Sequence, residues 1–81
     1  MEAPDVLTVY GVDWCGDCRR AKRHLDGSGT SYRFVDLGKD SEAKRILAAA
    51  GYRAISVIAT PDGRFLMEPS NTELTRLVQS L

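Results

Sequence analysis

Cysteine and histidine are scarce in this sequence, and their scarcity excludes several kinds of protein. Its 81 residues include two cysteines and one histidine. Two cysteines cannot form the several cross-links of a disulfide-stapled domain. With the histidine they still fall short of the four ligands of a structural zinc site. The chemistry of the chain is therefore expected to depend on one pair of thiols.

Long apolar runs and an excess of charge are also missing. No run reaches the roughly 20 apolar residues that span a bilayer, so no membrane association is expected. Eleven acidic residues balance eleven basic ones, which does not favour binding to nucleic acid. The first five residues lack the basic and apolar regions of a secretory signal, so a cytoplasmic location is expected. The length and a hydrophobic fraction of 43% predict one domain, residues 1–81.

The two cysteines stand in the motif Cys15-Gly16-Asp17-Cys18, between a strand-like segment and a helix-like segment. Two thiols at this spacing can close and reopen a small disulfide, which is typical of thiol–disulfide redox proteins. At the start of a helix, unpaired backbone N–H groups and the helix dipole favour the thiolate of the first cysteine. That thiolate can attack a substrate disulfide, and the second thiol can resolve the mixed disulfide.

Charged residues surround this motif, and their effects on the thiolate oppose one another. Asp13 and Asp17 should disfavour it, whereas Arg19 and Arg20 should favour it. The cationic run of Arg19, Arg20, Lys22 and Arg23 either docks an acidic partner or is a solvated helix face. His24, farther along, is expected to face solvent.

Strand-like and helix-like segments alternate along the whole chain. Short runs rich in β-branched and aromatic residues predict strands, and apolar residues spaced three and four apart predict helices. In chain order we expect a strand over 5–10, a helix over 15–26, a strand over 31–37, a helix over 40–50, strands over 54–60 and 64–67, and a final helix after residue 70. The order is βαβαββα. The first two strands should be parallel and the last two an antiparallel hairpin, closed by the turn Pro61-Asp62-Gly63.

Local signals mark the ends and inner faces of the later helices. Ser70 followed by Glu73 predicts a capping box for the last helix. Asp40 or Ser41 is the expected N-cap of the preceding helix, which Gly51 ends. The apolar stripe of that helix is Ala43, Ile46, Leu47 and Ala50.

This element order, with Cys-x-x-Cys after the first strand, resembles the thioredoxin fold in its short glutaredoxin branch. The resemblance covers nearly the whole chain and implies an α/β fold with a four-stranded mixed sheet flanked by three helices. Within that branch the sequence is similar to actinobacterial glutaredoxin-like proteins that include the mycoredoxins. The residues that carry the resemblance are Tyr10, Trp14-Cys15-Gly16-Asp17-Cys18, Gly51-Tyr52-Arg53, Pro61-Asp62-Gly63 and Glu68-Pro69-Ser70-Asn71 followed by Glu73-Leu74.

The resemblance implies a thiol–disulfide oxidoreductase that reduces disulfides, or mixed disulfides between a protein and a low-molecular-weight thiol. Cys15 would be the nucleophile and Cys18 the resolving thiol. Mycothiol or glutathione would be the thiol co-substrate, a disulfide reductase the electron source, and disulfide-containing proteins the substrates. No tightly bound cofactor or metal is expected, and the protein should be a monomer. The implied ligand- and substrate-binding residues are Trp14, Arg53, Ile55, Ser56, Ser70 and Asn71.

Several of these residues leave alternatives open. Trp14 is either a lid beside the nucleophile or a partly buried aromatic residue. Arg53 either pairs with a ligand carboxylate or lies at the rim of the site. A ligand carboxylate would approach Ser70 and Asn71, because a helix N-terminus suits an anion.

One position departs from the pattern of the resembling family. Relatives carry Val-Pro, with the proline in cis, where this chain has Ile55-Ser56. A cis bond before a residue other than proline costs about 3–4 kcal/mol, so a trans bond is the expectation. The departure motivates an alternative function, in which a dimer holds an iron–sulfur cluster or a metal through Cys15. A redox-inactive interaction domain is a third reading.

Overall fold

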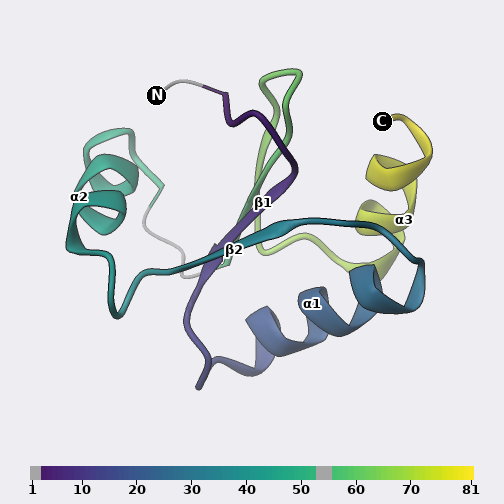
Figure 1. The fold of residues 1–81 in the computed structure, drawn as a ribbon, viewed down its shortest axis with the longest axis horizontal. Helices are drawn as coiled ribbons and strands as arrows, with labels where there is room; N and C mark the ends of the chain where they lie inside the picture. The colour runs from purple at the N-terminus through teal and green to yellow at the C-terminus, as the bar shows by residue number, and fades with distance from the viewer. Residues whose placement is uncertain (1–2, 53–55) are drawn as a thin grey trace.

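The computed structural model describes residues 3–52 and 56–81, and it has the expected order of elements. Figure 1 shows the chain running from β1 through α1 to β2, then through α2 into the β3–β4 hairpin and finally α3. The elements are β1 Thr8–Gly11, α1 Gly16–Gly27, β2 Arg33–Asp36, α2 Ser41–Ala49, β3 Val57–Ala59, β4 Phe65–Met67 and α3 Asn71–Gln79. The strands are shorter than the sequence predicts, and residues 54 and 55 of the expected third strand lie outside the described residues.

The four strands form one mixed sheet in the order β2-β1-β3-β4. β1 pairs with β2 in parallel and with β3 in antiparallel orientation, and β3 pairs with β4 in antiparallel orientation. The predicted strand directions are therefore confirmed. In the central pair, Val9 lies opposite Ile58 and Tyr10 lies opposite Val57, so the two members of each pair share a face of the sheet.

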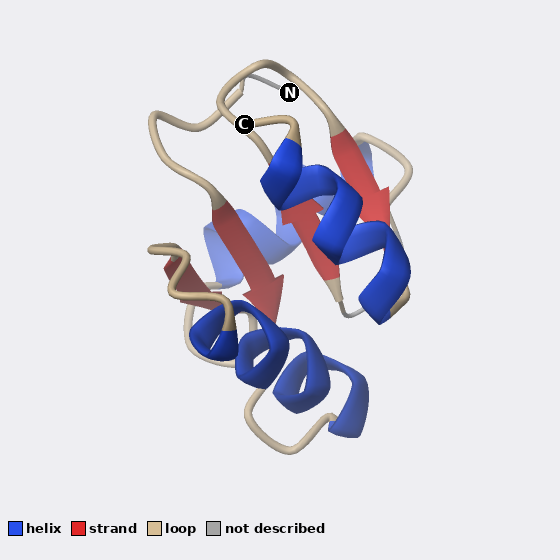
Figure 2. Ribbon diagram, turned by 90° about the vertical axis from the view of Figure 1, so that its right-hand side faces the viewer, coloured by secondary structure: helices blue, strands red, loops and turns tan. Residues whose placement is uncertain are grey.

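Helices cover both faces of the sheet. Figure 2 shows two helices on the near side of the strands and the third behind them. α1 and α3 pack against one face through a cluster that includes Leu25, Leu74 and the sheet residue Ile58. On the opposite face, Leu47 of α2 belongs to a second cluster that also contains both cysteines. Because side chains alternate between the two faces of the sheet, each layer of helices packs on its own hydrophobic cluster.

Two predictions about these elements are wrong. The first strand begins at Thr8 rather than at residue 5, because Asp5 and Val6 lie exposed before the sheet. The apolar stripe of α2 is not buried as a whole: Leu47 is 1% exposed, whereas Ile46 is 37% exposed and Ala50 is also exposed. Nine residues allow α2 to pack chiefly through its middle turn, so the neighbouring stripe positions remain at the edge of the contact.

The helix ends and turns follow the sequence closely. The Asp40 side chain accepts a hydrogen bond from the Ala43 N–H, which identifies Asp40 as the N-cap of α2. The capping box of α3 is present. Gly51 and Gly63 have φ angles of 91° and 96°, a conformation that glycine adopts without steric cost. Glu68, just after β4, is the one non-glycine residue in the described part of the chain with a positive φ, 48°.

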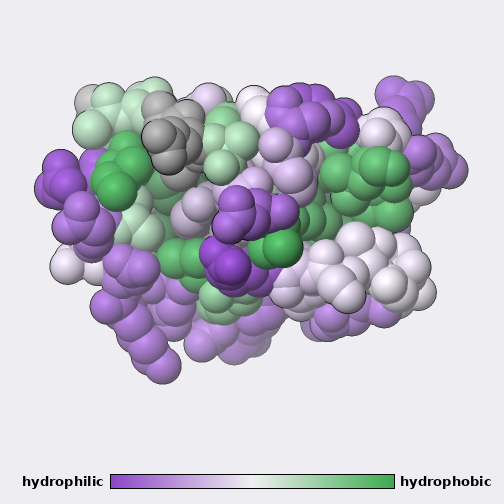
Figure 3. Space-filling view, turned by 45° about the horizontal axis from the view of Figure 1, so that its top comes forward, coloured by the Kyte–Doolittle hydropathy of each residue, from purple (hydrophilic) through white to green (hydrophobic). Residues whose placement is uncertain are grey.

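The surface is mostly hydrophilic with separate hydrophobic groups. Figure 3 shows such groups among hydrophilic residues on one face of the molecule. Among the described residues, the large hydrophobic ones that are exposed are Val6, Trp14, Ile46, Met67 and Leu81. Within residues 3–52 and 56–81, no helix is long and apolar enough to cross a membrane.

Candidate active site

Cys15 is the N-cap of α1, one position before the first helical residue. Its backbone is extended, with φ −86° and ψ 122°, and its carbonyl accepts the Arg19 N–H at 3.1 Å. The side chain of Cys15 makes no capping hydrogen bond. The thiol therefore stands beside the unpaired N–H groups and the positive end of the helix dipole. Its residue is 9% exposed, which puts it at the margin of the buried core.

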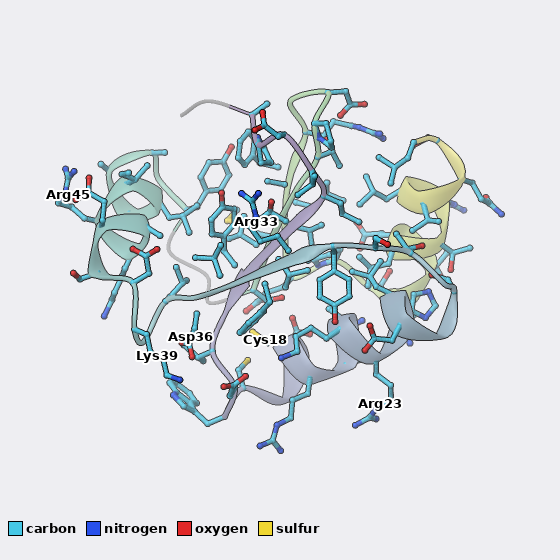
Figure 4. All side chains as sticks on the ribbon, viewed as in Figure 1. Cys18, Arg23, Arg33, Asp36, Lys39 and Arg45 are labelled. Carbon is cyan, nitrogen blue, oxygen red and sulfur yellow. The ribbon has the colours of Figure 1, made fainter. Side chains whose placement is uncertain are left out.

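Cys18 lies deeper, one helical turn into α1, and is 1% exposed. Figure 4 shows it between the start of α1 and the sheet. Burial raises the pKa of the Cys18 thiol, and a hydrogen bond and charge interaction with Cys15 raise it further. The Val12 backbone and the nearby Ser56 hydroxyl act in the opposite direction on that pKa. Cys15 is thus more exposed than Cys18, as expected if Cys15 is the nucleophile and Cys18 the resolving cysteine.

The acidic residues near the thiols are each paired with a cation. The Asp17 carboxylate lies 2.7 Å from the Arg20 guanidinium, and Asp13 lies 3.3 Å from the Lys22 ammonium. The Arg19 side chain donates to the Asp13 carbonyl at 2.7 Å. Asp13 and Asp17 thus each form an ion pair with a cation of α1, whereas Arg19 binds a backbone carbonyl.

Arg20 also joins the thiol-bearing helix to the start of α3. Its guanidinium donates to the Pro69 carbonyl at 2.7 Å and to the Asn71 side chain at 2.6 Å, in addition to Asp17. The Asp17–Arg20 pair can be read from its i,i+3 spacing. The contacts with Pro69 and Asn71 span 49 and 51 residues of sequence, and sequence reasoning missed them.

The start of α3 is already occupied by groups of the chain itself. The Ser70 N–H donates to the Glu73 carboxylate at 3.0 Å, and the Ser70 hydroxyl accepts the Glu73 N–H at 3.1 Å. The hydrogen bond from the Ser70 N–H to the carboxylate, and then the Ser70 side chain, lower the pKa of Glu73. The side-chain amide oxygen of Asn71 accepts a hydrogen bond from Arg20. A ligand carboxylate at this helix end would meet a negative charge, and the roles of Ser70 and Asn71 in ligand binding remain predictions.

The other predicted site residues occupy different environments. Trp14 is 74% exposed directly before Cys15, so it is not the partly buried aromatic residue of one reading, and a role as a lid remains a prediction. Ser56 is 0% exposed and lies inside the protein rather than on an open surface. Arg53 and Ile55 lie outside the described residues, and so does the Ile55–Ser56 peptide bond.

The basic residues of α1 have unequal surroundings. Lys22 lies over the Phe34 ring at 3.8 Å, while Arg23 projects from α1 away from the sheet in Figure 4. The His24 ring lies 2.9 Å from the Thr75 hydroxyl and is half-buried, so the prediction that it faces solvent is wrong in part. A groove of about 490 Å³ between α1 and α3 is lined by Arg20, Arg23, His24, Gly27, Ser28, Asn71 and Thr75. Docking of an acidic partner there stays a prediction.

The described residues gather no set of metal-binding side chains near the thiols. Across the parts of the chain that the structure describes, no group of three or more His, Cys, Asp or Glu side chains could hold a metal ion. Cys15 and Cys18 are not joined by a disulfide, so the site is described in its dithiol state.

This sheet, its helices and two thiols at the start of α1 define a protein of the thioredoxin fold with a Cys-x-x-Cys motif. The family model "Glutaredoxin" matches residues 7–59. The chain belongs to the glutaredoxin family, which supports thiol–disulfide oxidoreductase chemistry at the level of the family.

Individual relatives agree with this assignment. The chain is 29% identical over 77 residues to Mycoredoxin 1 of Corynebacterium glutamicum, covering 93% of this chain and 95% of that protein. A Mycobacterium tuberculosis protein named as a glutaredoxin is 31% identical over 70 residues, covering 84% and 83%.

Solved structures show the same fold. NrdH-redoxin of Escherichia coli superposes with a TM-score of 0.80 at 24% identity, covering 88% of this chain and 92% of that one. A glutaredoxin of Archaeoglobus fulgidus gives a TM-score of 0.75 at 19% identity, covering 90% and 85%. The predicted thioredoxin fold and its glutaredoxin branch are confirmed.

Proposed function

We propose that this protein reduces mixed disulfides between proteins and a low-molecular-weight thiol, with Cys15 as the nucleophile and Cys18 as the resolving thiol. The observation that carries the proposal is the placement of Cys15 at the N-cap of α1, with a side chain that is not used for capping and stands in front of buried Cys18. Similarity to a mycoredoxin supports mycothiol as the thiol, and membership of the glutaredoxin family supports glutathione.

The reaction has two exchange steps. The Cys15 thiolate attacks the substrate disulfide, forms a mixed disulfide and releases one substrate thiolate, which takes up a proton. The Cys18 thiol then loses its proton and attacks the Cys15 sulfur, which forms the Cys15–Cys18 disulfide and releases the second substrate thiolate. The substrate gains two electrons and the protein loses two. A second low-molecular-weight thiol can replace Cys18 in the last step, and a disulfide reductase returns the electrons to the protein.

Trp14 supplies the apolar surface on which the substrate rests beside the nucleophile. Large aromatic residues that remain exposed often mark contact sites, because they bury much area with few rotatable bonds. Because the protein would work on its thiols in the dithiol state, we place it in the cytoplasm, where thiols are kept reduced.

The test is turnover of a small mixed disulfide with mycothiol, glutathione and thioredoxin reductase recycling systems, each run separately. Cys15→Ser should abolish turnover, because no other thiolate stands at the helix start. Cys18→Ser should retain turnover with a low-molecular-weight thiol, which then completes the second exchange. Full turnover by Cys15→Ser would falsify the mechanism. A dimer that takes up a coloured iron–sulfur cluster through Cys15, with no turnover in any system, would support the cluster-binding alternative instead.

A further inference from the structure

Ser56 carries a buried hydroxyl that the fold does not use. The residue is 0% exposed, and within the described part of the chain its Oγ meets no hydrogen-bond partner of ordinary geometry. An unpaired hydroxyl in the interior is destabilising, because it has lost its hydrogen bonds to water without replacing them. Such a group in a native structure calls for an explanation, and a partner that changes its state during the reaction is one.

The strand register shows which side of the sheet this hydroxyl faces. The Glu68 N–H donates to the Ser56 carbonyl at 2.7 Å, which continues the β3–β4 ladder by one residue. Side chains alternate along a strand, so Ser56 points to the same face as Ile58, two residues later. Ile58 packs in the cluster that contains Ala21 of α1. The Ser56 side chain therefore points toward the layer that holds α1.

The chain directions place Ser56 at the thiol end of α1. Because α1 connects the parallel strands β1 and β2, it runs back against β1, and β3 also runs against β1. The start of β3 thus lies beside the start of α1. Cys18 shares the inner face of α1 with Ala21 and Leu25, and it is the member of that face nearest the helix start. The lowering of the Cys18 pKa by the Ser56 hydroxyl agrees with this placement.

We propose that the Ser56 hydroxyl donates a hydrogen bond to the Cys18 sulfur as that sulfur becomes the thiolate that resolves the mixed disulfide. This inference rests on the proposed function, in which Cys15 and Cys18 exchange disulfides in sequence. In the second exchange, the Cys18–Cys15 sulfur bond forms and the bond from Cys15 to the substrate sulfur breaks. Cys18 gives its proton to solvent, and the leaving thiolate takes one from solvent.

The need for this donor arises only in the second exchange. In the dithiol protein, burial is the main cause that raises the pKa of Cys18, and Cys15 raises it further. Once Cys15 is bound in a mixed disulfide, its sulfur no longer titrates, and burial is the main factor that opposes the Cys18 thiolate. The Ser56 hydroxyl and the Val12 backbone then favour that thiolate. The nearby carboxylates of Asp13 and Asp17 are each paired with a cation.

The chromogenic disulfide DTNB separates the two exchanges in one stopped-flow trace. Attack by Cys15 releases a first thionitrobenzoate, and closure by Cys18 releases a second. In Ser56→Ala we expect an unchanged first phase and a second phase slowed about three- to tenfold at neutral pH. A thiolate that loses a hydrogen-bond donor forms less readily but is intrinsically more nucleophilic, which limits the loss. For the same reason the second phase of the variant should recover at alkaline pH.

Three further variants test whether the effect of Ser56→Ala is specific to the second exchange. In Cys18→Ser, which has no second phase, adding Ser56→Ala should leave the first phase unchanged. Thr60→Ala removes another fully buried hydroxyl, which serves the β3–β4 turn, and should leave both phases unchanged. Ser56→Thr keeps a hydroxyl and should hold the second phase closer to that of the natural chain than Ser56→Ala does.

The outcomes distinguish this inference from the proposed function. Two phases in the natural chain with an unaltered second phase in Ser56→Ala, at every pH, would overturn the role of Ser56 and leave the dithiol mechanism intact. The absence of a second phase from the natural chain would overturn the dithiol mechanism itself. Slowing of both phases in Ser56→Ala would indicate a general structural defect and would also overturn the inference.

Discussion

Removal of the Arg20 side chain should destabilise the fold, because this one guanidinium joins the thiol-bearing helix to the start of α3. It bonds the Asp17 carboxylate, the Pro69 carbonyl and the Asn71 side chain at 2.7, 2.7 and 2.6 Å. The latter two groups lie 49 and 51 residues away in sequence. Arg20→Ala therefore breaks a tertiary link as well as a local ion pair.

The expected magnitude follows from the number and exposure of these bonds. A hydrogen bond to a charged group contributes about 1.5–3 kcal/mol when it is well buried, and a solvent-exposed ion pair contributes about 0–1 kcal/mol. The Arg20 side chain is 32% exposed and that of Asp17 is 33% exposed, so each bond is discounted toward the lower figure. We expect a loss of about 2 kcal/mol for the three bonds together, and hence a decrease in Tm of about 8–16 °C in a domain of this size.

Thermal unfolding followed by circular dichroism measures this loss, and the same helix supplies a matched control. Arg23 is an exposed arginine one turn away, and its side chain makes no hydrogen bond with the described residues. Arg23→Ala should change Tm by no more than about 2–4 °C, as is usual for an exposed position. Arg20→Lys should fall between the two variants, because one ammonium cannot reproduce the forked contacts of a guanidinium. If Arg20→Ala unfolds at the same temperature as Arg23→Ala, the link contributes nothing and the reasoning is wrong.

Two further predictions concern the segment between β4 and α3. The pKa of Glu73 is lowered first by the Ser70 N–H and then by the Ser70 side chain, so its folded value lies below its unfolded value. The stability that this carboxylate contributes is therefore present above the unfolded pKa, about 4.3, and is lost as the pH falls through the folded one. Glu73→Gln should make Tm less dependent on pH in the acid range, and an unchanged slope would contradict this. Glu68 has a φ of 48°, which disfavours most side chains but is tolerated by asparagine, so Glu68→Asn should raise stability by about 0.5–1 kcal/mol in urea unfolding. An unchanged or lower midpoint would show that the backbone there is not strained.

Local signals in the sequence were sufficient for the order of elements and for the position of the dithiol. The motif from Cys15 to Cys18 lies between a β-branched run and a helical stripe, and both are local patterns. The α3 capping box depends on Ser70 and Glu73 alone, three residues apart. The glycine at position 63 suits the turn of the β3–β4 hairpin for a reason contained in that turn. These features required no knowledge of which segments meet in space.

The features that sequence reasoning missed depend on contacts between distant segments. The stripe of α2 looked uniform from Ala43 to Ala50, yet the sheet contacts it mainly through Leu47, because the extent of burial is set by where a short helix meets the sheet. The occupation of Asn71 by Arg20 depends on two helices that pack side by side. The burial of Ser56 likewise depends on the register of β3 beside β1 and β4. Pattern periodicity indicates which face turns inward, but it does not indicate what that face meets.

The family match covers the part of the chain that carries the thiols, but not the start of α3, to which Arg20 links the thiol-bearing helix. The glutaredoxin model matches residues 7–59, which include Cys15, Cys18 and Ser56. Pro69 and Asn71, which accept hydrogen bonds from Arg20, lie beyond that match. Family membership therefore bears on the exchange chemistry at the thiols, and much less on the start of α3, where a ligand carboxylate would approach. Glu73 and Arg20 already occupy that helix end. Substitutions at Asn71 and Glu73 should therefore change the preference for one low-molecular-weight thiol over another. The same substitutions should change the rate of exchange at Cys15 less.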